Sequence, residues 1–153
     1  MANSYQRVLL QYVFAVKGRQ NILHKSFRDE VFRYITGIIE QKGQKSIIVN
    51  GVADHVHVLV GVKPPFEMDA FIRDVKNNSS KFINKKDWLR TKFAWQVGYG
   101  VFSYNQEQVH RVYNYILNQE AHHAKQTFRE EYIQFLLENE IEYDEKYLFE
   151  WYD

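Results

Sequence analysis

The chain contains no cysteine and only two prolines, which are adjacent at Pro64-Pro65. Without cysteine it cannot form disulfides, so a small disulfide-stapled secreted scaffold is excluded. It also has no apolar run long enough to span a membrane and no recognisable basic-apolar leader. We therefore expect a protein of a reducing, cytoplasmic compartment that makes no contact with membranes.

The 153 residues are 45% hydrophobic, which predicts one domain over residues 1–153 with ample material for a core. The formal net charge of +1 is unevenly distributed along the chain. Residues 129–153 hold two basic and nine acidic side chains, a net of −7, which leaves +8 on residues 1–128. A basic body with an acidic C-terminal tail from about residue 129 is compatible with binding to nucleic acid.

The excess of positive charge is greatest between residues 73 and 92, where seven basic and two acidic residues give a net of +5. This segment begins as an amphipathic helix after Pro64-Pro65, and its polar face carries Arg73, Lys76 and Lys81. These three side chains are candidates for contact with a DNA backbone. A role in facing solvent is about as plausible for each of them.

Two histidines lie two residues apart within a valine-rich segment that reads as a β-strand, residues 51–61. Because side chains alternate faces along a strand, His55 and His57 point to one side while Val56, Val58 and Val60 point to the other. Two imidazoles roughly 6 to 7 Å apart can bind one divalent ion, but a third ligand is needed. Taken alone, the pair is more easily explained as ordinary surface or hydrogen-bonded histidines.

Residues 106–125 are predicted to form an amphipathic helix with Asn105 as its N-cap and an apolar stripe along one face. On the opposite face lie Tyr115, Gln119 and His122. Tyr115 and Gln119 are four residues apart and so can address one small site. The simplest interpretation of His122 is a solvated helix face, and the adjacent His123 has no assignable role.

The remaining periodicities predict an α+β fold, a ferredoxin-like or RRM-like antiparallel sheet packed with helices. Helices on one face of the sheet would leave the histidine face free to meet the Tyr115 helix and DNA. Gly98-Tyr99-Gly100 is expected to act as a hinge before that helix. Strands are predicted at 5–16, 46–50, 54–62 and 93–97, and helices at 26–42, from about 68 onward, at 106–125 and at 128–138.

Three segments, taken together and in order, resemble the single-tyrosine HUH transposases, the small transposases of bacterial insertion sequences of the two-hundred and six-hundred-and-five type. The segments are Asp54-His-Val-His-Val-Leu-Val60, Trp95-Gln-Val-Gly-Tyr-Gly-Val-Phe-Ser103 and Tyr115-Ile-Leu-Asn-Gln-Glu-Ala-His-His123. Three linked motifs at family-like spacing are far more specific than any single one.

The resemblance implies that His55, His57 and Gln119 bind Mg²⁺ or Mn²⁺ and that Tyr115 is the nucleophile. The implied activity is cleavage of single-stranded DNA to a covalent 5′-phosphotyrosine, followed by rejoining of strands. The family acts as homodimers on hairpins near the ends of the element, and assembly of the site within or between subunits stays open. Since this ligand set is neutral, we expect weak metal binding without DNA phosphate.

Three other functions remain open at the level of sequence. The protein could be a domesticated, chromosomal relative that cuts single-stranded repeats without moving its own gene. It could be a non-catalytic single-stranded DNA-binding module in which Tyr115 stacks on a base, although such a module needs no paired histidines. A metal-dependent hydrolase of small phosphoesters would leave the basic body unexplained.

Overall fold

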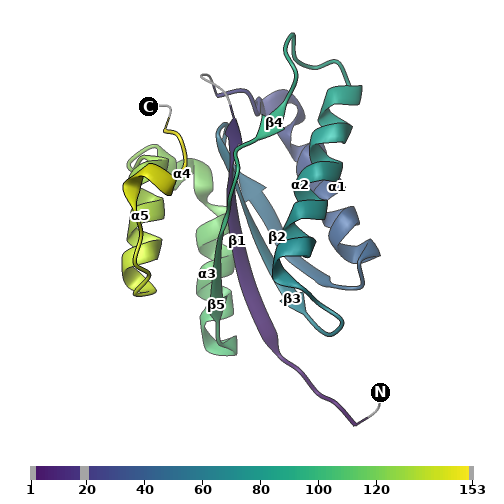
Figure 1. Ribbon diagram of the computed structural model, residues 1–153, viewed down its shortest axis with the longest axis vertical. Coiled ribbons are helices and arrows are strands. Elements are labelled where there is room, and N and C mark those ends of the chain that lie inside the picture. The colour runs from purple at the N-terminus through teal and green to yellow at the C-terminus, as the bar shows by residue number, and fades with distance from the viewer. Residues whose placement is uncertain (1–2, 18–20, 152–153) are drawn as a thin grey trace.

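The computed structural model describes residues 3–17 and 21–151, which fold into a five-stranded antiparallel sheet with helices on both faces (Figure 1). The strands are β1 (Val8–Lys17), β2 (Lys45–Gly51), β3 (His55–Val62), β4 (Ala94–Trp95) and β5 (Gly100–Tyr104). The helices are α1 (Lys25–Gln41), α2 (Met68–Lys85), α3 (Val109–Leu117), α4 (Gln119–His123) and α5 (Phe128–Glu138), with short 3₁₀ turns at Gln106–Gln108 and Glu145–Tyr147. Among the described residues, no helix has both the length and the apolar character needed to cross a membrane.

The sheet has the order β2-β3-β1, and both β4 and β5 pair with the remaining edge of β1. On one face, alternate residues of β1 and β3 pack with α1 and α2 in the main core, which includes Tyr12, Phe14, Val56 and Val58. All four of these side chains are fully buried. The predicted α+β architecture, an antiparallel sheet packed with helices, is therefore confirmed.

The opposite face of the sheet, which carries the histidines, is also covered. Figure 1 shows α3 against this face and α5 outside it, on the side of the sheet away from α1 and α2. Val13 and Ala15 of β1 pack with Phe128 and Tyr132 of α5 in a second core. The sequence predicted that the Tyr115 helix would meet this face. It did not predict that α5 would cover it as well.

Two elements differ from the sequence prediction. The expected hinge at 98–100 leads into β5 rather than directly into a helix, because Gly98 takes a positive φ of 93° and the chain then pairs with β1. The expected helix 106–125 is broken at Asn118, whose φ of −99° and ψ of 29° separate α3 from α4. Asn105 does cap this region, through a capping box with Gln108.

Gly100 is the point at which α5 comes closest to the sheet. A Cβ atom there would lie 2.7 Å from Tyr132 Oη and 2.9 Å from Tyr132 Cε1. The Tyr132 ring cannot swing away easily, since it is only 5% exposed and packs 4.9 Å from the ring of Phe149. Glycine at this position therefore permits the close docking of α5.

We predict that Gly100→Ala lowers the free energy of unfolding by about 1–3 kcal/mol, the usual range for overpacking a tight contact. Gly37→Ala is the matched control, because Gly37 lies in α1 with no atom near its missing Cβ. That change should stabilise the protein by about 1 kcal/mol through helix propensity. Urea denaturation of both variants measures the difference, and equal stabilities would contradict the close approach of α5.

Candidate active site

The two histidines of β3 are fully buried on the sheet face that α1 and α2 do not cover, with ring centroids 5.1 Å apart. Each ring is oriented through its Nδ1 atom. His55 Nδ1 lies 2.7 Å from Asp54 Oδ1, and His57 Nδ1 lies 2.7 Å from Gln11 Oε1. An acceptor at Nδ1 fixes the tautomer and leaves Nε2 available as a metal ligand.

Tyr115 and Gln119 reach the same place from α3 and α4. The break at Asn118 turns the chain so that Gln119 is fully buried, with its Oε1 3.3 Å from His55 Nε2. The Tyr115 ring is half-buried, and its centroid lies 6.2 Å from that of His57. The structure thus brings the four predicted site residues together within one chain.

Asn50 of β2 fixes the end of the Tyr115 helix. Its Nδ2 donates hydrogen bonds to the carbonyl oxygens of Ile116, at 2.9 Å, and Leu117, at 3.2 Å. Asn50 is also the partner of His57 in the β2–β3 register. One side chain therefore ties the C-terminus of α3 to the strand next to the histidines, and sequence reasoning did not identify it.

Glu131 of α5 is the central site residue that the sequence interpretation missed. Its Oε1 lies 3.2 Å from His55 Nε2 and 3.1 Å from His57 Nε2. Its Oε2 accepts hydrogen bonds from the Tyr115 hydroxyl and, at 3.3 Å, from Gln119 Nε2. The carboxylate is 2% exposed. The signal in the sequence was an acidic residue at helical spacing within the apolar stripe of Phe128, Tyr132 and Phe135.

The two adjacent histidines at the end of α4 also belong to the site. His123 Nε2 lies 3.2 Å from Glu131 Oε1, and its ring centroid is 4.5 Å from that of His55. His122 stacks on Tyr115 with a centroid separation of 4.4 Å. The expectation that His122 lies on a solvated helix face was wrong, because the break at Asn118 rotates α4 toward the site.

Burial and the Glu131 charge set the protonation of this cluster. Burial alone would lower the pKa of His55, but the hydrogen bonds and charges of Asp54 and Glu131 outweigh it and raise that pKa to about 9. Burial lowers the pKa of His57. Burial and the neighbouring Glu131 carboxylate raise the pKa of Tyr115 well above its usual range. Tyr115 is therefore a neutral phenol beside a carboxylate.

The donor atoms fit a divalent ion. His55, His57, His123 and Glu131 each offer one ligand atom, and these four atoms all lie within 4.8 Å of one another. His123 Nε2 is buried and lies 3.2 Å from Glu131 Oε1, but without the geometry of a hydrogen bond. A buried ring nitrogen placed in this way beside a carboxylate is what a metal ligand would present.

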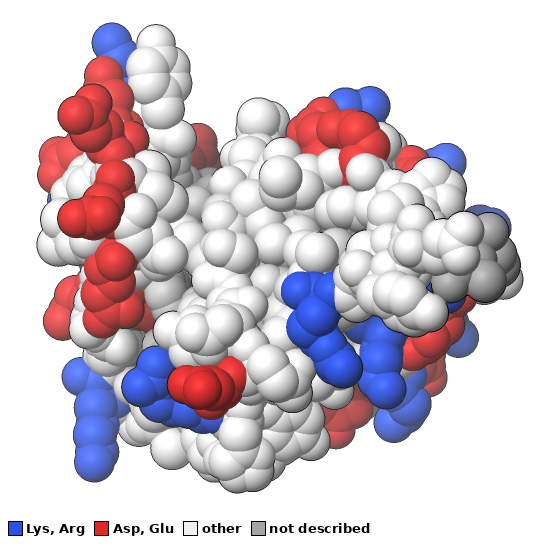
Figure 2. All heavy atoms as spheres, turned by 90° about the horizontal axis from the view of Figure 1, so that it is seen from below, with Lys and Arg blue, Asp and Glu red and all other residues white. Residues whose placement is uncertain are grey.

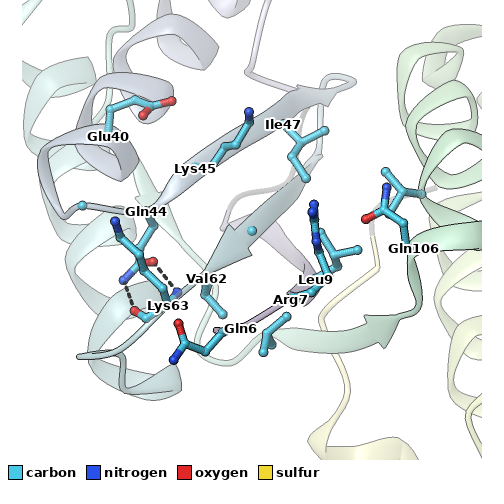
Figure 3. A pocket seen from close by; sticks show the side chains of 14 residues that line it. Gln6, Arg7, Leu9, Glu40, Gln44, Lys45, Ile47, Val62, Lys63 and Gln106 are labelled. Atoms are coloured by element: carbon cyan, nitrogen blue, oxygen red, sulfur yellow. Dashed lines mark hydrogen bonds between the residues drawn. The ribbon is translucent and has the colours of Figure 1, made fainter. Parts of the chain in front are cut away.

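A cleft of about 550 Å³ between α3 and α5 leads to Tyr115 and Glu131, and Arg111 also lines it. A larger cavity of about 760 Å³ lies elsewhere, where β1 and β2 begin and β3 ends. Figure 3 shows Arg7, Lys45 and Lys63 around it. No residue of the histidine cluster lines this larger cavity. The cluster is reached from the cleft at Tyr115 and Glu131 and also borders a smaller pocket of about 240 Å³, which Asp54 and His123 line.

The three basic residues predicted to contact DNA lie on α2, across the sheet from the histidines. Arg73 is exposed and paired with Asp69. Lys76 donates to the carbonyl oxygens of Gln96, at 2.7 Å, and Gly98, at 2.8 Å, and Lys81 is exposed. DNA contact by these residues stays a prediction, and it would involve a part of the nucleic acid remote from Tyr115.

Acidic side chains gather along one side of the molecule. Figure 2 shows them as a column on the left, where α5 and the C-terminal segment lie. The acidic segment from about residue 129 thus begins within a packed helix, with Thr127 and Glu130 forming its capping box. Apart from the buried Glu131, the acidic residues of α5 are exposed on the side of the helix away from the histidines.

Solved structures of other proteins share this fold. A crystal structure of a protein proposed to be a transposase, from Deinococcus radiodurans, is 20% identical, with a TM-score of 0.61 over 76% of this chain and 94% of that chain. A REP-associated tyrosine transposase bound to a REP hairpin is 12% identical, with a TM-score of 0.59 over 79% of this chain and 74% of that chain. At these identities the two structures show a shared fold.

No curated protein sequence matches the chain. The family model described as "Transposase IS200 like" matches residues 4–119, which is most of the chain and includes the paired histidines, Tyr115 and Gln119. The chain belongs to the IS200-like transposase family.

Proposed function

We propose that the protein is a divalent-metal-dependent tyrosine transposase that cuts and rejoins single-stranded DNA, with Tyr115 as its nucleophile. The observation that carries this proposal is the convergence of a tyrosine hydroxyl and two histidine Nε2 atoms on one buried carboxylate. A module that only bound DNA would have no need of a tyrosine beside paired histidines. The fully buried imidazoles are not available for contact with bases.

In the proposed reaction, Tyr115 Oη attacks the scissile phosphorus. The new bond joins Tyr115 to the 5′-phosphate, the bond from phosphorus to the 3′ oxygen breaks, and the leaving 3′ oxygen takes a proton from water to give a 3′-OH. The phosphoester is retained in the protein–DNA link, so a second 3′-OH can reverse the step and join new ends without ATP. A bound Mg²⁺ or Mn²⁺, held by His55, His57 and Gln119, would polarise the phosphate oxygens.

The proton of Tyr115 has an acceptor in place. Because burial raises the pKa of the phenol, the hydroxyl needs help to become a nucleophile. Glu131 Oε2 already accepts its hydrogen bond. We assign Glu131 Oε2 as the atom to which this proton moves as the bond to phosphorus forms.

The proposed substrate is a single strand near a DNA hairpin. The cleft beside Tyr115 has a volume of about 550 Å³ and a cationic side chain, Arg111, among its lining residues. A solved structure with the same fold is described as bound to a REP hairpin, which supports a hairpin partner for this chain. The basic polar face of α2, with Arg73 and Lys81, would bind backbone phosphates away from the cleavage point.

We retain the homodimer as part of the proposal. The described site takes Tyr115, Gln119 and both histidines from one chain, which supports assembly of the site within a subunit. A dimer would hold two DNA ends side by side for strand exchange. Whether the gene is mobile or domesticated is decided by its flanks, where a mobile element would carry hairpins at both ends.

The first test uses single-stranded oligonucleotides that cover the flanks of the gene, incubated with the protein and Mg²⁺ or Mn²⁺ and separated on a denaturing gel. We expect a heat-stable protein–DNA adduct that depends on the metal. Tyr115→Phe should abolish it, because this change removes the hydroxyl that forms the ester. His57→Ala should reduce it at least 100-fold, on the order of the loss seen when an electrostatic group is removed.

The matched control is Tyr113→Phe, which removes a hydroxyl two residues away on the same helix. It should leave adduct formation within about twofold of the unmodified protein, within the range of ordinary surface substitutions. If the adduct still forms in Tyr115→Phe, the nucleophile is a residue other than Tyr115. Tight hairpin binding with no adduct in any variant would favour the non-catalytic binding module.

A second test concerns the anchoring of the Tyr115 helix. Asn50→Ala removes both hydrogen bonds to the end of α3, and a misplacement of about 1 Å at a reacting group can reduce the rate on the order of 100-fold. We expect the adduct to form 10- to 100-fold more slowly at saturating DNA, with hairpin affinity unchanged. Asn78→Ala, at an exposed position of α2, is the control. Equal rates for the two variants would contradict the positioning role of Asn50.

A further inference from the structure

We infer that His123 and Glu131 are metal ligands, which with His55 and His57 form an imidazole-rich site that selects Mn²⁺ over Mg²⁺. This inference deepens the proposed function, since it concerns the same site. The ligand set expected from the sequence contained neither residue. Both also lie beyond residues 4–119, the part of the chain that the family model matches. They are therefore features of this chain that the family model does not supply.

The first argument is geometric. Divalent ions bind imidazole and carboxylate at about 2.0–2.2 Å, so neighbouring ligand atoms lie about 2.8–3.1 Å apart around an octahedral ion and about 3.3–3.6 Å apart around a tetrahedral one. Glu131 Oε1 lies 3.1 to 3.2 Å from the Nε2 atoms of His55, His57 and His123. Gln119 Oε1 lies 3.3 Å from His55 Nε2. These separations match the edges of a coordination polyhedron around one ion.

The second argument is the orientation of the rings. Asp54 and Gln11 occupy the Nδ1 atoms of His55 and His57, so both Nε2 atoms are directed to the side where Glu131 lies. His123 Nε2 is buried there as well, with no hydrogen bond to the described residues. Three imidazole nitrogens aimed at one carboxylate oxygen exceed the number of hydrogen bonds that this oxygen can accept well. A cation among them would satisfy all four atoms.

The third argument is that α5 is docked against the histidines in a way that fixes Glu131. Phe128, one turn before Glu131, stacks on the His55 ring with centroids 3.9 Å apart and planes 9° apart. The capping box of Thr127 and Glu130 fixes the start of the helix. The position of Glu131 is therefore determined by packing on both sides, as a ligand requires.

The ligand chemistry sets the metal preference. Mg²⁺ favours oxygen ligands and retains its waters. First-row transition ions, of which Mn²⁺ is the weakest binder, gain affinity from nitrogen ligands, so a site with three imidazoles favours Mn²⁺ over Mg²⁺. Three imidazoles, one carboxylate and the amide oxygen of Gln119 supply five donors. An ion with six ligands keeps one position for a phosphate oxygen. Because Glu131 adds a negative charge, the protein should bind Mn²⁺ without DNA, in contrast to the weak binding expected of a neutral set.

The test is Mn²⁺ and Mg²⁺ binding to the full chain without DNA, by isothermal titration calorimetry and by the loss of the free Mn²⁺ signal in electron paramagnetic resonance. We expect Mn²⁺ to bind at least tenfold more tightly than Mg²⁺. Glu131→Gln and His123→Ala should each weaken Mn²⁺ binding at least tenfold, since even an outer partner of a ligand contributes 10- to 100-fold. Mn²⁺ should also raise the melting temperature of the unmodified protein.

Matched controls distinguish the loss of a metal ligand from the mere loss of a negative charge or of an imidazole ring. Glu138→Gln removes the same charge from an exposed position of α5, and His110→Ala removes an exposed histidine ring from α3. Both should bind Mn²⁺ as the unmodified protein does. The inference is overturned if Glu131→Gln and His123→Ala retain full Mn²⁺ affinity, or if Mn²⁺ does not change the melting temperature. The proposed function fails separately, through the absence of a Tyr115 adduct, while metal binding persists.

Discussion

The alternation of side chains along β1 and β3 is the constraint on which the rest of this structure depends. A strand with one fully apolar face must bury it, and the valines of β3 do so against α1 and α2. The intervening positions are then directed to the other face, where His55 and His57 lie between Gln11 of β1 and Asn50 of β2. Burial of one face thus fixes the position and direction of the histidines on the other.

Covering that second face creates a buried polar network, which is stable only if its members are paired. Glu131 is the member that pairs most of them, because its two oxygens lie against three imidazoles, an amide and a phenol. The same carboxylate would be costly to bury alone. Its burial is compensated by the positive and hydrogen-bonding groups around it, which lower its pKa although burial acts in the opposite direction. The site and the docking of α5 therefore depend on each other.

Short-range periodicity was sufficient to predict most elements of the fold. The paired strands β2 and β3, the helix α2 and the bounds of α5 all follow from apolar spacing within about 20 residues. The periodicity failed at Asn118, where the helix breaks because Asn50 of a distant strand binds the last carbonyls of α3. It also failed at β5, since a five-residue strand that begins at Gly100 has little local signal and is stabilised by pairing with β1. Both failures come from contacts between segments far apart in the sequence.

The sequence by itself determined that His55 and His57 share a strand face, because that relation depends only on the period of a strand, which is local. It placed Tyr115 and Gln119 four residues apart, but the break at Asn118 decides how the two side chains lie. Only the tertiary structure decided that these pairs meet, that His123 turns toward them and that Glu131 joins them from α5. The partners of an acidic residue in a helix cannot be predicted from the neighbouring sequence. Its burial depends on where the helix docks in the tertiary structure.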